Sequence, residues 1–133
     1  MTHVSELARI LNKTFNWNKA RIFCLAQMVK GLIAVKTVNL MEVSTSFTTS
    51  SKSSSSYRRM QRFFQSFRFE LMQMASFVFD RFSLSRKCIL AIDRTNWKFG
   101  KAHLNLLVIS IVYKGIAIPI YWKNLSKGGF FLH

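Results

Sequence analysis

Asp93 is the residue whose type and position most clearly suggest chemistry. It follows the apolar run CILAI at residues 88–92 and precedes the string RTNWKFGK at residues 94–101. Nucleic-acid enzymes often use the end of a buried strand to present the first acidic ligand of a catalytic metal. Carboxylate oxygens suit this task because Mg²⁺ and Mn²⁺ prefer hard oxygen ligands. The pattern therefore predicts that Asp93 binds such a metal and acts in catalysis.

Asp93 has few acidic residues that could join it at a metal. The other acids of the chain are Glu6, Glu42, Glu70 and Asp80, all within the expected helical part or its loops. A two-metal site for phosphodiester chemistry needs several carboxylates at one point. We therefore expect the chain not to hold a magnesium ion stably. The alternative is that Asp93 is a solvated acid paired with Arg94 or a nearby lysine.

Polar side chains after Asp93 are candidates for contacts to DNA. These are Arg94, Asn96, Lys98 and Lys101. Cationic and amide side chains bind phosphate oxygens and fix the position of a protein on the nucleic acid. The alternative is that the loop is polar simply because it is exposed. Trp97 and Phe99 could stack on an unpaired nucleotide, or pack beneath the loop.

A second cationic cluster lies near the middle of the chain, at Arg58, Arg59 and Arg62. Cations at the start of a helix oppose its macrodipole, and a phosphate backbone docked there would remove this penalty. The whole chain has 20 Lys and Arg, 5 Asp and Glu and a net charge of +15. DNA is therefore the expected partner. The alternatives are a solvated charged face for the cluster and an anionic membrane surface for the chain.

The first part of the chain, residues 1–82, has helical periodicity. We expect one helix before residue 16, a second over residues 19–38 and a third over residues 57–82, with Ser55 or Ser56 as its N-cap. Residues 44–56 are rich in Ser and Thr, which indicates a loop. This loop is either a flexible connector or a source of hydroxyl contacts to DNA.

From residue 88 the apolar pattern becomes that of strands. The runs 88–93, 104–113 and 116–122 predict three strands, and Lys114-Gly115 predicts a tight hairpin turn between the last two. Pro119 cannot donate to a ladder, so the third strand should be an edge strand or carry a bulge. The fold class is therefore α+β, with a helical region over 1–82 and a sheet region over 88–133.

Other features narrow the classes of protein. No run reaches the ~20 apolar residues of a membrane span, and the amino terminus lacks the order of a secretory signal. We expect a cytoplasmic protein without a membrane partner or a small-molecule substrate. Cys24 and Cys88 are expected to be core residues, and the three histidines share no zinc-ligand spacing with them.

Four segments resemble the amino-terminal half of bacterial DDE insertion-sequence transposases, most closely the insertion-sequence-four group. They are YRRMQRFF at 57–64, LAIDRTNWKFG at 90–100, NLLV at 105–108 and GIAIPIYW at 115–122. The resemblance covers nearly all of the chain. It implies that the helices over 1–82 form a DNA-binding region. It also implies that a ribonuclease H-like domain follows over 88–133, in which Asp93 is the first Asp of the triad and Mg²⁺ or Mn²⁺ is the cofactor.

The resemblance also implies which parts of such an enzyme to expect here. The second Asp and the Glu of the family come after further strands, so we expect a truncated transposase. It would hold the first three strands of the ribonuclease H-like domain, bind DNA, and neither cut nor join strands alone. The alternative is a non-catalytic nucleic-acid-binding or regulatory protein, such as an inhibitor that partners the full-length transposase.

Overall fold

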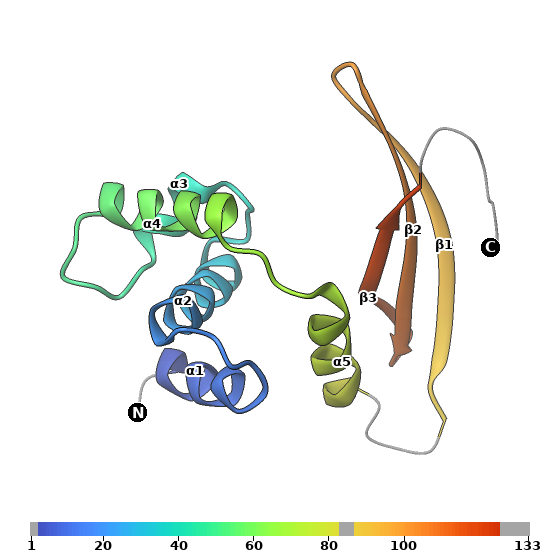
Figure 1. Ribbon diagram of the computed structural model, residues 1–133, viewed down its shortest axis with the longest axis horizontal. Helices are drawn as coiled ribbons and strands as arrows, with labels where there is room; N and C mark the ends of the chain where they lie inside the picture. Colours follow the sequence, from blue (N-terminus) through green and yellow to red (C-terminus); the bar gives the residue numbers. More distant parts are fainter. Residues whose placement is uncertain (1–2, 83–86, 126–133) are drawn as a thin grey trace. The chain divides into compact units, whose positions relative to one another are not determined.

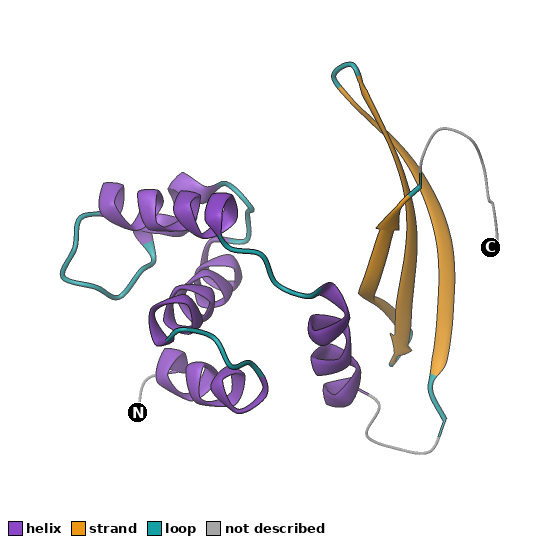
Figure 2. Ribbon diagram, viewed as in Figure 1, coloured by secondary structure: helices purple, strands orange, loops and turns teal. Residues whose placement is uncertain are grey.

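The computed structural model describes residues 3–82 and 87–125, in an α+β arrangement of five helices and three strands (Figures 1 and 2). The helices are α1 (His3–Thr14), α2 (Lys19–Val35), α3 (Leu40–Thr45), α4 (Ser53–Ser66) and α5 (Leu71–Phe82). The strands are β1 (Ile89–Phe99), β2 (Ala102–Tyr113) and β3 (Ile116–Asn124). The chain divides into two compact units. We name them the helical unit, Met1–Arg68, and the sheet unit, Phe69–His133.

The helical unit has a core built from α2, α3 and α4. Its buried members are Cys24, Met28, Val43, Phe47, Met60 and Phe63. Helix α1 packs on α2, and Phe15, just after α1, stacks on Trp17. The Asn18 side chain caps α2 by accepting a hydrogen bond from the backbone N–H of Ala20 at 2.7 Å. The expected second helix is therefore confirmed, although it ends at Val35, where Lys36 takes the left-handed conformation (φ 57°).

Two predictions around the Ser- and Thr-rich segment were wrong. The loop is shorter than residues 44–56, because Ser44 and Thr45 belong to α3 and α4 already begins at Ser53. The N-cap of α4 is Lys52, not Ser55 or Ser56. Ser56 is instead buried inside α4. Serine composition alone overstated the loop because four serines at the start of a helix still allow one amphipathic face to form.

The expected helix over residues 57–82 is two helices. Phe67 is extended (φ −97°, ψ 127°), and the Arg68 guanidinium donates to the carbonyls of Phe64, Gln65 and Phe67 at the end of α4. The apolar faces of the two helices enter different cores. Met60 of α4 is buried in the helical unit, whereas α5 packs on β3 and β2. The division of the chain therefore falls after Arg68, and α5 belongs with the strands rather than with the other helices.

The sheet is antiparallel with the order β1-β2-β3. The turn at Lys114-Gly115 is confirmed, and both residues have positive φ (49° and 79°), as a type I′ turn requires. The register of β2 and β3 shifts between Ile109 and Ser110, beside Pro119. The expected bulged edge strand is thus confirmed in β3. Ring contact between Phe82 and Tyr113, with centroids 5.2 Å apart, joins the end of α5 to β2.

Strand β1 is longer than predicted, which changes the position of Asp93. The strand does not end at Asp93 but continues to Phe99, and Asp93 pairs with Val108 in mid-strand. The turn lies at Gly100-Lys101, where Gly100 has φ 60°. Residues 94–99 stay in the sheet because β2 extends far enough to pair with every one of them. The expectation that Asp93 ends a strand and begins a loop was therefore wrong.

Candidate nucleic-acid interface

Asp93 is exposed on strand β1. Its carboxylate accepts a hydrogen bond from the backbone N–H of Arg94 at 2.8 Å. Within residues 3–82 and 87–125, no three His, Cys, Asp or Glu side chains gather where they could hold a metal ion. Metal binding by Asp93 stays a prediction.

Arg94 does not form the ion pair with Asp93 that the sequence left open. Its Nε donates to Oδ1 of Asn105 across the strand pair at 2.9 Å. The two residues are adjacent in β1, so their side chains project to opposite faces of the sheet. Asn105 also ties down the end of β3, because its carbonyl accepts from the backbone N–H of Leu125 at 2.6 Å. Arg94 is thus a side chain with a fixed partner at the sheet surface.

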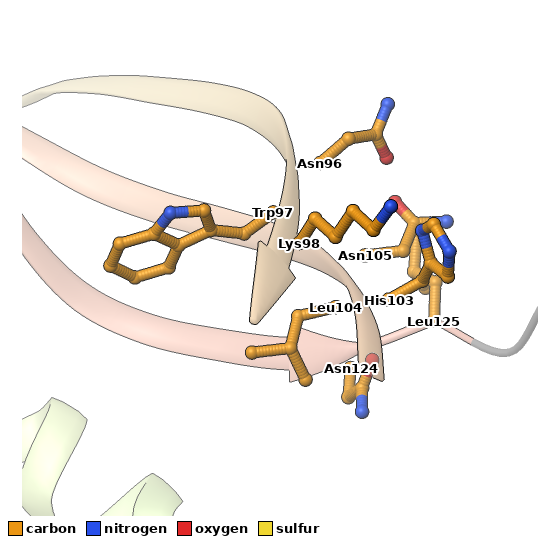
Figure 3. A pocket seen from close by; sticks show the side chains of 8 residues that line it. All are labelled: Asn96, Trp97, Lys98, His103, Leu104, Asn105, Asn124 and Leu125. Carbon is orange, nitrogen blue, oxygen red and sulfur yellow. The ribbon is translucent and has the colours of Figure 1, made fainter. Parts of the chain in front are cut away.

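Asn96 and Lys98 come together at the far end of the β1–β2 hairpin, where a hollow of about 550 Å³ opens. Its lining is Asn96, Trp97, Lys98, His103, Leu104, Asn105, Asn124 and Leu125. Figure 3 shows Lys98, His103 and Asn105 on one side, while Trp97 points to the other. Trp97 is 62% exposed, so it does not pack in a core here. The side chain of Phe99 lies outside what the structure describes.

Lys101 is exposed in the turn beyond this hollow, beside Gly100. The sequence grouped it with Arg94, Asn96 and Lys98 as one loop. The structure places these other three on strand β1 and only Lys101 in the turn. The hairpin therefore presents its polar residues along a rigid strand, which fixes their spacing more closely than a loop would.

Arg59 and Arg62 of α4 lie at a second hollow, of about 700 Å³, inside the helical unit. It is lined by Lys19, Ala20, Arg21, Phe23, Cys24, Arg59, Arg62, Phe63 and Ser66. Arg58 is exposed on the same helix but does not line this hollow. The three arginines predicted as one cluster thus divide into two that share a hollow and one that does not.

Lys19 and Arg21 were missed by the sequence analysis. A signal existed, because both lie in the first turn of α2, where the helix dipole disfavours cations. That argument was applied instead to Arg58, Arg59 and Arg62. Because α4 begins at Ser53, these arginines lie beyond its first turn, where the dipole effect has fallen off. The unfavourable effect of the helix dipole on cations therefore applies to Lys19 and Arg21 of α2 and not to the arginines of α4.

The floor of the hollow in the helical unit is apolar. Phe63 and Cys24 are 8% and 2% exposed. Burial raises the pKa of the Cys24 thiol, and the nearby charge of Arg59 offsets part of that rise. The expectation of a core position is confirmed for Cys24. It was wrong for Cys88, which is exposed just before β1, the outer strand of the described sheet.

No family model, no curated protein and no solved structure matches the chain. No helix among the described residues has both the length and the apolar content to cross a membrane.

Proposed function

We propose that the chain is the DNA-binding amino-terminal part of a DDE transposase and carries only the first Asp of the catalytic triad. One observation carries the proposal. The string Asp93-Arg94-Thr95-Asn96-Trp97 lies on the first strand of a three-stranded antiparallel sheet with the order β1-β2-β3. A ribonuclease H-like domain begins with such a sheet and has its first acid on the first strand. The position of Asp93 and the strand order therefore both support the proposal.

The proposed partner is DNA. The acids of the helical unit are Glu6 and Glu42, and Glu6 is paired with Arg9. The Lys and Arg residues of this unit outnumber its two acids. An excess of cations favours association with a polyanion, because binding releases counterions from the phosphates. The polar side chains along β1 add hydrogen-bond donors in the sheet unit. Both units thus offer groups that bind phosphate.

The proposed role excludes strand cleavage by this chain alone. Phosphodiester chemistry in this class needs several carboxylates around two metal ions, and in residues 3–82 and 87–125 no such group surrounds Asp93. With Mg²⁺ or Mn²⁺ and supercoiled plasmid, the purified chain should bind the DNA without nicking it. Asp93→Ala should bind equally well. Nicking by the wild type that disappears in Asp93→Ala would contradict the proposed inactivity.

A second candidate is a regulatory protein that binds nucleic acid and inhibits a full-length transposase. The exposed Arg59, Arg62 and Lys98 favour it too, since a regulator needs to bind nucleic acid and needs no metal centre. Co-expression with an active transposase of the same group distinguishes the two. A regulator lowers the transposition frequency, and its Asp93→Ala variant does so equally. No change in frequency excludes this candidate.

A further inference from the structure

The hollow between the start of α2 and α4 joins four cations from distant parts of the sequence. Lys19 and Arg21 come from α2, and Arg59 and Arg62 come from α4. All four are exposed, and no acidic residue lines the hollow. Folding of the helical unit therefore assembles a concentrated positive site that neither segment has by itself.

The four cations are not neutralised by the described part of the chain. Arg9 and Glu6 form the ion pair found there, and none of the four joins a carboxylate. Arg21 lies over the ring of Phe67, 4.6 Å from its centroid, and Nε of Arg62 donates to the carbonyl of Arg58 at 3.4 Å. These contacts orient the guanidinium groups without cancelling their charge. Their mutual repulsion, with the positive end of the α2 dipole, would be relieved by an anion.

The shape and composition of the hollow favour a chain of phosphates over a single small anion. A lone carboxylate or phosphate is satisfied by one or two cations, for example one bidentate arginine. Here the cations stand on two helices around an open space of about 700 Å³. Phe23, 37% exposed, adds an apolar surface beside them. A polyanion whose charges repeat along its backbone matches cations on two helices, and the C–H groups of its sugars can contact Phe23.

We propose that this hollow is a binding site for the DNA backbone, in which Lys19 and Arg21 bind phosphates together with Arg59 and Arg62. The inference rests on the proposed DNA binding and assigns it to a particular surface. Arg59 and Arg62 should contribute more to DNA binding than Arg58, because Arg59 and Arg62 line the hollow and Arg58 does not.

The test measures the affinity of the full chain for a fluorescently labelled mixed-sequence DNA duplex over a series of salt concentrations. Each phosphate contact contributes about 0.9 to the slope of log affinity against log salt. Lys19→Ala, Arg21→Ala, Arg59→Ala and Arg62→Ala should each lower the slope by about that amount and the affinity by about three- to tenfold. Lys13→Ala removes an exposed cation of α1 that does not line the hollow, and it should leave the slope unchanged. Arg58→Ala should lower it less than Arg59→Ala.

Several outcomes separate failure of this inference from failure of the proposed function. Wild-type chain that shows no salt-dependent DNA binding would overturn both. Binding that survives all four substitutions, or that responds as much to Arg58→Ala as to Arg59→Ala, would overturn the inference alone. Tighter binding to duplex RNA, or to vesicles with anionic lipid, with the same dependence on the four residues would assign the hollow to another polyanion. Circular dichroism and slow labelling of Cys24 verify that each variant is folded.

Discussion

The two units of the molecule differ in how far they bury their own apolar residues. Most of the buried apolar side chains belong to the helical unit, whereas in the described part of the sheet unit they are Ala75, Ile111 and Ile120. On β1, Ile89, Leu90 and Ile92 are each at least half exposed (67%, 50% and 69%). The helical unit thus has a closed core of its own, and the sheet unit has a sheet with α5 on β2 and β3. The two units therefore differ in how complete their described cores are.

The two cysteines offer the largest expected difference between the units. Cys24 is buried with a raised pKa, and Cys88 is exposed. Because the thiolate is the reactive form, an alkylating reagent reaches Cys24 only when the helical unit opens. An opening free energy of about 5 kcal/mol would make Cys24 react at least ~10³-fold more slowly than Cys88. Mass spectrometry of peptides labelled over time measures both rates, and equal rates would contradict a closed core.

Met60 tests the same core by substitution. Its side chain is fully buried against residues of α2 and α3. Met60→Ala should lower the free energy of unfolding of the helical unit by about 2–5 kcal/mol, because it leaves a cavity. Met72→Ala, at a 55% exposed position of α5, is the matched control and should change stability by less than about 0.5 kcal/mol. Denaturant titration followed by circular dichroism provides the measurement. Equal losses in the two variants would show that the core is not where the structure places it.

Gly31→Ala tests side-chain packing in the helical unit. A Cβ at Gly31 would lie 2.5 Å from Oγ of Ser46 and 2.8 Å from Cγ1 of the buried Val43. The clash, about 1–3 kcal/mol, should exceed the gain of about 1 kcal/mol in helix propensity, so Gly31→Ala should destabilise the helical unit.

Gly115→Ala is the companion variant in the sheet unit. It meets no neighbour within 4 Å but requires φ 79°, a left-handed conformation that costs about 1–2 kcal/mol. Hydrogen exchange, which resolves the two units, should show each loss confined to its own unit. A loss spread over both would mean that the units do not unfold separately.

The smallest expected effect on folded stability comes from Ile92→Lys on the outer edge of β1. An exposed residue should change the stability by less than about 0.5 kcal/mol. The charge should nevertheless reduce self-association, because an open edge strand pairs readily with another chain. The control is Ile116→Lys, at 65% exposure on β3, whose edge is already protected by Pro119 and the shift in register. Sedimentation at increasing concentration compares them, and equal behaviour would show that the edge of β1 does not drive association.

Sequence patterns predicted those parts of the fold that depend on nearby residues. The second helix follows from apolar periodicity, and the turn at Lys114-Gly115 follows from a glycine that tolerates positive φ. The end of α4 was not predictable in this way. Residues 57–82 have a continuous helical pattern, and only the division of their apolar faces between two cores breaks it at Phe67.

The candidate site was predicted only in part for the same reason. Arg59 and Arg62 could be identified as a cationic pair on a helix, but their meeting with Lys19 and Arg21 depends on how α2 packs against α4. The position of Asp93 was misjudged because the length of β1 is set by its pairing with β2. Both features require contacts between residues distant in sequence, which a local pattern does not contain.

The assignment of DNA binding to the helical unit can be tested most directly by hydrogen exchange of the full chain with and without a DNA duplex. If DNA binds the helical unit, DNA should slow exchange in the first turns of α2 and along α4, with a smaller change in the β1–β2 hairpin. Protection confined to the hairpin, with α2 and α4 unchanged, would contradict it.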